Sequence, residues 1–283
     1  MRTIKQIHEA EYSPVADLIT YSPLPSQSAD QIDPFLFLNH HGPQVYRPGN
    51  NGLPFGPHPH RGMETVTFIL EGDILHKDSS GHKSIITAGG IQWMTAGRGL
   101  IHAEVSSDEF KKNGGKLEIL QLWINLPSRQ KMVPPAYIGF QKEQIPAFTA
   151  DNGKVKVNVI SGYWGETKGA YDSLNSVQMN TIEFASGGKL NTKVSTEENI
   201  FLYVVKGSLI INGQDISIRQ LVEFNNDGEE VSMSAVTESY VIFGHAKPFN
   251  EPVVAHGPFV MNTMEEIREA YTDYKSGKFG KFE

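Results

Sequence analysis

Short apolar runs, separated by turns that contain glycine or proline, recur along the whole 283-residue chain. Residues 65–70, 91–94, 117–126 and 200–205 each have the length of a β-strand and are rich in aliphatic and aromatic side chains. Turn residues return at short intervals, so little chain is left between the runs for the helices of βαβ units. The pattern therefore predicts an all-β fold of antiparallel strands.

A helical pattern follows the last strand-like run near the C-terminus. Thr263 and Glu266 have the spacing of a capping box, in which each side chain bonds the backbone N–H of the other residue. Gly277 is a residue type at which helices commonly end. Apolar side chains recur with helical spacing at Ile267, Ala270, Tyr271 and Tyr274. We expect one short C-terminal helix that packs this stripe against a β-barrel.

The charge and composition exclude several classes of protein. A formal net charge of -7 argues against a surface for nucleic acid or anionic membranes, because both need clustered positive charge. No apolar segment approaches the ~20 residues of a membrane span, and the charged stretch 1–16 lacks the apolar centre of a signal peptide. The sequence contains no cysteine, which excludes disulfides and thiolate ligands. We expect a cytoplasmic protein.

Two short motifs place histidine and glutamate at alternate positions beside predicted strands. His58 and His60 precede one apolar run, and His102 and Glu104 follow another. Alternate residues of a strand point to the same face, so each pair presents its two side chains together. If the two strands face each other inside a small barrel, three imidazoles and one carboxylate converge. Such a set of donors suits a divalent transition metal.

A single His-x-His pair is more often a surface pair or a buried structural pair than a metal site. The second pair favours the metal site here, as does the glycine-containing turn 97–99 that leads into it. Glu64 has the same parity as His58 and His60 and is therefore a second candidate carboxylate.

These motifs resemble those of a known family. Residues 58–67 read HPHRGMETVT and residues 92–104 read QWMTAGRGLIHAE, and both closely resemble the pirin family of the cupin superfamily. The resemblance continues at 122–127, 131–133 and 256–263. It implies a bicupin fold, that is, two antiparallel jelly-roll β-barrels with a short C-terminal helix.

The expected domain organisation follows from this resemblance and from the turn pattern. Residues 1–135 are expected to form an N-terminal metal-binding cupin barrel, and residues 136–250 a C-terminal cupin barrel without metal ligands. The tail and helix at 251–283 are expected to return to the N-terminal domain.

The second half of the chain repeats the first with different chemistry. Overlaying the strand 200–205 on its counterpart at 65–70 puts Lys193 and Ser195 at the positions of the two leading histidines. Neither residue is a normal ligand for this class of metal. No histidine occurs in this half before position 245. We therefore expect residues 151–245 to form a barrel without a metal.

Four further histidines are assigned outside the ligand set. His40 and His41 are adjacent at the end of an apolar run, and adjacent strand residues face opposite ways. We expect His40 to be structural or to support the site, and His41 to face solvent. His76 and His82 lie in a polar hairpin, where we expect both to be exposed.

The resemblance assigns the fourth metal ligand to Glu104, in addition to His58, His60 and His102. Glu64 is then expected to make a supporting contact with Arg61 or Arg98. Which of the two glutamates accepts a proton during catalysis stays open at this point.

The same resemblance suggests the chemistry. Three histidines favour iron, nickel, copper, cobalt or manganese over magnesium or calcium, and pirin-like proteins imply Fe(II) as the first choice. The implied activity is a quercetin 2,3-dioxygenase, which uses dioxygen to cleave a flavonol with release of carbon monoxide. Glu104 is the expected catalytic residue.

Two other functions are compatible with a cupin barrel. Animal pirins bind iron and act as partners of transcription factors, so the barrel could be a redox-sensing interaction module with a protein partner. An isomerase or epimerase acting on a phosphorylated sugar is disfavoured, because the surroundings of Trp93 and Met94 are apolar and no Arg/Lys cluster is present to hold a phosphate.

Overall fold

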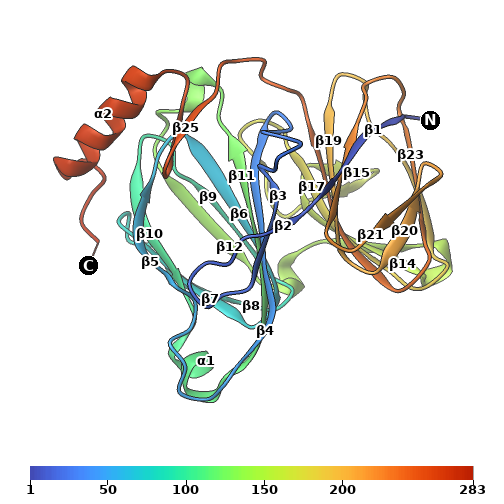
Figure 1. Ribbon diagram of the computed structural model, residues 1–283, viewed down its shortest axis with the longest axis horizontal. Helices are drawn as coiled ribbons and strands as arrows, with labels where there is room; N and C mark the ends of the chain where they lie inside the picture. Colours follow the sequence, from blue (N-terminus) through green and yellow to red (C-terminus); the bar gives the residue numbers. More distant parts are fainter. Residues whose placement is uncertain (283) are drawn as a thin grey trace. The chain divides into compact units, whose positions relative to one another are not determined.

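The computed structural model describes residues 1–282 and is built almost entirely from β-strands (Figure 1). The chain divides into two compact units. Unit 1 comprises residues 1–11, 22–35 and 143–248, and unit 2 comprises residues 12–21, 36–142 and the chain from residue 249 onward.

Unit 2 is a sandwich of two main sheets and a small hairpin. The seven-stranded sheet has the order β12 (Ala136–Phe140), β9 (Ile91–Thr95), β6 (Met63–Glu71), β11 (Gly115–Asn125), β4 (Phe35–Tyr46), β3 (Thr20–Leu24) and β2 (Glu11–Tyr12). The four-stranded sheet has the order β5 (Phe55–His60), β10 (Leu100–Val105), β7 (Asp73–Asp78) and β8 (Lys83–Thr87). The hairpin consists of β25 (Val254–His256) and β26 (Phe259–Met261). The short 3₁₀ turns of the chain are Ser128–Gln130, Lys142–Gln144 and Asp151–Gly153.

Two tight turns carry the chain between the sheets of unit 2. Arg61 and Gly62 connect β5 of the four-stranded sheet to β6 of the seven-stranded sheet. Residues 96–99 make the reverse passage, from β9 to β10. The two turns are joined by a hydrogen bond of 2.8 Å from the Gly62 N–H to the Gly97 carbonyl. The strands that carry the candidate ligands therefore start or end at one end of the sandwich.

Unit 1 repeats the plan of unit 2. Its seven-stranded sheet has the order β1 (Ile4–Glu9), β22 (Gln220–Phe224), β19 (Asn199–Lys206), β24 (Ser239–Ala246), β17 (Gln178–Phe184), β14 (Val155–Ser161) and β13 (Ala147–Ala150). Its four-stranded sheet has the order β18 (Lys189–Lys193), β23 (Glu230–Ala235), β20 (Ser208–Ile211) and β21 (Gln214–Ser217), and β15 (Tyr163–Trp164) pairs with β16 (Thr167–Lys168).

The interior of unit 1 is filled by aliphatic and aromatic side chains. Its buried core includes Val157, Ile182, Leu202, Val204, Val241 and Phe243. Lys193 ends β18 and is exposed, and Ser195, just beyond it, is also exposed. Burial of this apolar surface is what holds the unit together.

The N-terminal segment lies in a different unit from the one expected. Residues 1–11 and 22–35 were expected within the domain 1–135, yet they belong to unit 1. The reason is strand pairing, because β1 adds to the edge of the unit 1 sheet by pairing antiparallel with β22. Such a pairing joins segments more than 200 residues apart and leaves no local signal in the sequence.

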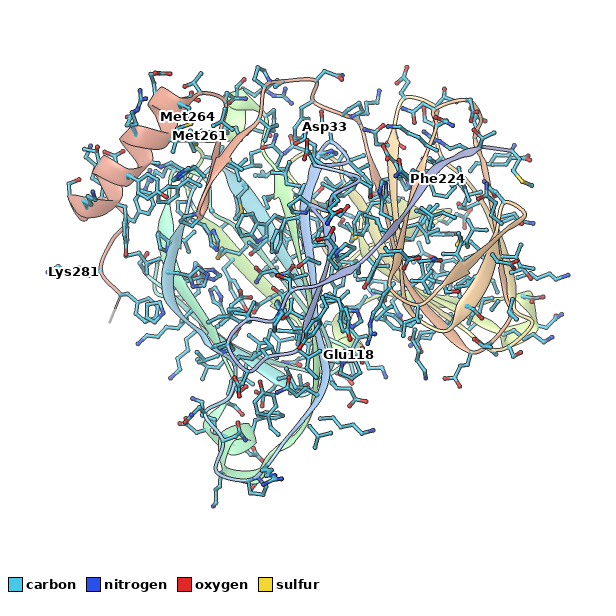
Figure 2. The ribbon with its side chains drawn as sticks, in the orientation of Figure 1. Asp33, Glu118, Phe224, Met261, Met264 and Lys281 are labelled. Atoms are coloured by element: carbon cyan, nitrogen blue, oxygen red, sulfur yellow. The ribbon has the colours of Figure 1, made fainter. Side chains whose placement is uncertain are left out.

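The all-β fold of two sandwich-like barrels is confirmed, and so is the C-terminal helix. Helix α2 (Met264–Lys275) begins at the capping box, with a bond of 3.2 Å from the Glu266 N–H to the Thr263 hydroxyl. Figure 2 shows Met261 on β26 and Met264 at the start of α2, on either side of the turn that joins them.

A second helix, α1 (Asp108–Asn113), was not expected. It has six residues and is capped by the hydroxyl of Ser107. Within residues 1–282, neither helix has the length and apolar character that crossing a membrane requires.

Candidate metal centre

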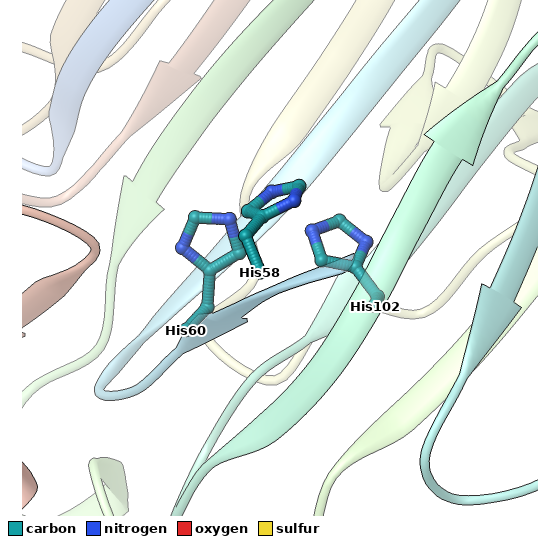
Figure 3. Close-up of side chains that lie close together, drawn as sticks. All are labelled: His58, His60 and His102. Carbon is teal, nitrogen blue, oxygen red and sulfur yellow. The ribbon is translucent and has the colours of Figure 1, made fainter. Parts of the chain in front are cut away.

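Strands β5 and β10 bring the three predicted histidine ligands together. The strands pair antiparallel, and His102 lies directly opposite His58. Figure 3 shows the rings of His58, His60 and His102 pointing toward one another. One nitrogen from each ring lies within 4.8 Å of the other two. The two strands were expected to face each other across a barrel, but they are hydrogen-bonded neighbours in one sheet. The histidine side chains therefore project from the same face of that sheet.

The sequence of β5 suits its place at the edge of the four-stranded sheet. Pro57 and Pro59 have no backbone N–H, so they are tolerated where one side of a strand has no partner. The order of the sheet puts β5 at its edge, with β10 as its neighbour. The two prolines can therefore lie next to the histidines without removing a hydrogen bond between β5 and β10.

Backbone carbonyl groups fix the tautomers of two imidazoles. The Nδ1 atom of His58 lies 2.7 Å from the Gly56 carbonyl, and the Nδ1 atom of His60 lies 3.1 Å from the Pro258 carbonyl. Because a carbonyl oxygen can only accept, each Nδ1 carries the proton and each Nε2 carries the lone pair. This arrangement is typical of metal-binding histidines.

Several of these nitrogens are buried without a hydrogen-bond partner. The Nε2 atom of His60 and both ring nitrogens of His102 have no partner among the described residues. Leaving a buried polar atom unpaired costs about 1–3 kcal/mol, so such atoms call for an explanation. A metal ion that accepts one lone pair from each of the three imidazoles accounts for the Nε2 atom of His60 and for one of the two nitrogens of His102. The donor set present fits a transition metal.

Burial also keeps the imidazoles uncharged. Desolvation, followed by the neighbouring His58, lowers the pKa of His60 to about 3. Desolvation and the nearby His60 hold the pKa of His102 well below its usual value. Both rings are therefore neutral at pH 7, and neutral imidazole is the form that binds metals.

Glu104 lies on the same strand as His102 but outside the group of converging histidines. Its carboxylate is buried and accepts hydrogen bonds from three donors on β6, β9 and β11 of the seven-stranded sheet. The Oε1 atom accepts hydrogen bonds from the Thr67 hydroxyl, at 2.9 Å, and from the Gln92 amide. The Oε2 atom accepts one from the Gln121 amide. Its role as fourth ligand stays a prediction.

Glu64 occupies a different environment from the one expected. It contacts neither Arg61 nor Arg98 but accepts a hydrogen bond of 2.7 Å from the Thr95 hydroxyl, with Trp93 as a further hydrogen-bonding neighbour. The expectation of an arginine contact was wrong, because Arg61 is bonded elsewhere. Complete burial raises the pKa of Glu64 to about 7.

His76 was expected to be exposed, and this was wrong. Its ring is buried, stacks on Tyr137 with centroids 3.8 Å apart, and lies 5.5 Å from the ring of His102. Its Nε2 atom bonds Asp78 at 3.0 Å. The alternation of β7 puts Ile74, His76 and Asp78 on the buried face, and this period of two was the available signal. His82 is exposed, as expected.

His40 and His41 are both buried. His40 bonds Glu118 at 2.8 Å, in keeping with a structural role. His41 was expected to face solvent, and this was wrong. Its Nδ1 atom lies 2.8 Å from the Thr20 hydroxyl, and burial lowers its pKa to about 3. Strand β4 is covered on both faces at this point, so alternation does not expose either ring.

Two β-sandwich units, one of which carries the cluster of His58, His60 and His102, define a bicupin with a candidate metal centre. Residues 17–124 match the family described as Pirin, and residues 179–280 match the family described as Pirin C-terminal cupin domain. A pirin-like protein of Caulobacter vibrioides is 35% identical over 260 residues, which cover 90% of this chain and 91% of that protein. The chain therefore belongs to the pirin family.

Solved structures share this fold. A structure of quercetin 2,3-dioxygenase from Acinetobacter baumannii superposes with a TM-score of 0.93 at 33% identity, covering 99% of both chains. The bacterial pirin YhhW from Escherichia coli, solved in complex with nickel(II), superposes with a TM-score of 0.68 at 21% identity, covering 86% of this chain and 99% of that one.

Proposed function

We propose that this protein is a metal-dependent dioxygenase that cleaves a flavonol such as quercetin at its 2,3 bond, with release of carbon monoxide. The observation that carries the proposal is the convergence of three imidazoles, the half-buried His58 and the buried His60 and His102, with nitrogens within 4.8 Å of one another. Membership of the pirin family and the similarity to the Acinetobacter baumannii quercetin 2,3-dioxygenase support the choice of reaction.

We assign His58, His60 and His102 as ligands of one divalent transition metal, with Glu104 as the fourth ligand. Fe(II) is our first choice, and nickel, copper, cobalt and manganese suit the same donors. A redox-active metal bound there would supply a Lewis acid for the flavonol oxygens and the redox chemistry that dioxygen requires.

Glu104 is proposed to take the proton of the flavonol 3-hydroxyl. A carboxylate oxygen has two lone-pair directions, and Oε1 already accepts bonds from Thr67 and Gln92. Among residues 1–282, Oε2 accepts from Gln121 alone, so one direction on Oε2 is left for the metal or for a substrate proton. The three donors fix the orientation of the carboxylate.

Glu64 is the competing base. Its pKa of about 7 also suits proton transfer at neutral pH, and it is buried. Comparing turnover by Glu64→Gln and Glu104→Gln separates the two assignments. Full activity in Glu104→Gln with loss of activity in Glu64→Gln would show that the assignment is reversed.

The test of the proposed reaction is turnover of quercetin by iron-loaded protein, followed by its visible absorbance with and without oxygen. We expect bleaching only in the presence of oxygen, with carbon monoxide formed alongside. Absence of oxygen uptake with quercetin and other flavonols would overturn the proposal and favour an interaction module that binds metal without a dedicated substrate.

A further inference from the structure

The C-terminal segment of unit 2 makes direct contact with the histidine cluster. The residue Phe259 of β26 forms a parallel bridge with Arg61, and the Val260 N–H bonds the Arg61 carbonyl at 3.0 Å. One residue earlier, the carbonyl of Pro258 receives the Nδ1–H of His60 at 3.1 Å. The group that sets the tautomer of one candidate ligand thus comes from about 200 residues further along the chain.

Arg61, which follows His60 in the sequence, binds this segment through its side chain. Its buried guanidinium donates to Asp273 on α2 at 2.8 Å and to the Arg98 carbonyl at 2.7 Å. The ring of Phe279 covers the same guanidinium, with its centroid 4.7 Å from Cζ. Asp273 is also buried, and its other carboxylate oxygen accepts a hydrogen bond of 2.6 Å from the exposed Lys278.

The glycines of the two sequence motifs leave room for the same segment. A Cβ atom on Gly62 would lie 2.0 Å from the Val260 carbonyl oxygen, and one on Gly99 would lie 2.5 Å from the ring of Phe279. Both glycines also have positive φ angles, +80° and +123°. Any larger residue at either position would push the segment away.

A buried lysine also binds the segment by hydrogen bonds. The Nζ atom of Lys131 donates to the carbonyls of Gly62 and Val260, at 2.9 and 3.0 Å, and to the Asn125 side chain at 2.7 Å. The motif residues Arg61, Gly62 and Gly99, together with Lys131, therefore contact the C-terminal segment.

We infer that residues 258–279 are an orienting part of the metal centre, with Arg61 and Asp273 as positioning residues. Docking of the segment places the Pro258 carbonyl on the Nδ1–H of His60, which leaves the Nε2 lone pair for the metal. This inference rests on the proposed metal site. By linkage, a segment that strengthens metal binding is itself held more tightly when metal is bound.

The experiment compares Asp273→Asn with Glu265→Gln, using Co(II) as the probe metal. Glu265 lies on the same helix and pairs with Arg268 on the exposed surface at 3.0 Å, so it is a matched loss of one charge. We expect Asp273→Asn to weaken Co(II) binding about 10-fold or more and to change the visible Co(II) bands. Glu265→Gln should match the wild type in both.

Hydrogen exchange on the wild type gives a second readout that needs no variant. Co(II) should slow exchange in residues 259–279 relative to the metal-free protein. If Asp273→Asn shifts only the melting temperature, with affinity and Co(II) bands unchanged, or if Co(II) leaves exchange in the segment unaltered, the segment is structural only. If the wild type binds no Co(II), the proposed metal site itself fails.

Discussion

Exchanging the residue types at positions 104 and 121 separates the contribution of Glu104 to stability from its proposed contribution to catalysis. In Glu104→Gln, three hydrogen bonds to a charged carboxylate become neutral ones. The new amide can accept on one side only. If its oxygen keeps the bonds from Thr67 and Gln92, its NH2 group faces that of Gln121, so the Gln121 amide must turn over or a buried donor is left unpaired. Weakening these hydrogen bonds or leaving one buried donor unpaired costs about 1–3 kcal/mol. We therefore expect the free energy of unfolding to fall by about that amount.

The partner variant Gln121→Glu is expected to be destabilised for a related reason. The Oε1 atom of Gln121 accepts the indole N–H of Trp123 at 3.0 Å, and its Nε2 atom donates to Glu104. Replacing that donor by oxygen sets two carboxylates against each other, which costs about 1–3 kcal/mol.

The double variant Glu104→Gln with Gln121→Glu restores the pattern. The new glutamine donates to the new glutamate, which still accepts from Trp123, and one negative charge remains. We expect a favourable coupling energy of at least about 1 kcal/mol, measured by urea unfolding of metal-free protein as a double-mutant cycle. Turnover should stay roughly 10²-fold or more below wild type, because the base has moved.

Two results would refute this reasoning. A coupling energy within about 0.5 kcal/mol of zero would mean that the amides do not hold Glu104 as described. Recovery of quercetin turnover in the double variant would mean that a carboxylate at position 104 is not required for proton transfer.

Three further predictions concern the ligands and the buried glutamate. His60→Ala should lower the metal content well below one equivalent per chain, as measured by elemental analysis, and full retention would remove His60 from the ligand set. The barrel formed by residues 151–245 should bind no metal, so a second equivalent that survives loss of His58 and His60 would contradict its assignment. Glu64→Gln should become more stable relative to wild type as the pH rises from about 4.5 to 7, by up to about 3 kcal/mol. The sign follows because burial raises the pKa of Glu64 from 4.5 to about 7, so the folded wild type holds the proton longer than the unfolded chain and loses stability over that range. Parallel urea titrations of both metal-free proteins give this difference, and a constant offset across the range would show that Glu64 is not buried as described.

The features that follow from local alternation could be predicted from the sequence. The His58 and His60 pair, like the His102 position, depends only on the period of two within a strand. The same rule misled at His41, because alternation says which way a ring points and not what covers it. His76 was expected to be exposed because its neighbours in sequence are polar, although it shares the buried face of β7 with Ile74.

The remaining features depend on contacts that are distant in sequence. The amides around Glu104 come from Gln92 and Gln121, on strands whose register is set by the folded sheets. The ion pair between Arg61 and Asp273 joins residues 212 positions apart. Strand pairing of this range carries no local pattern, so neither contact could be predicted from single positions.

The number of imidazoles bound to the metal is the quantity on which both the proposed reaction and the role of the C-terminal segment depend. X-ray absorption spectroscopy of iron-loaded protein measures it directly from the scattering of the imidazole rings. We expect three imidazoles and at least one oxygen donor around a single iron per chain. Two or fewer imidazoles, or an unchanged spectrum in His102→Ala, would contradict the assignment of His58, His60 and His102 as its ligands.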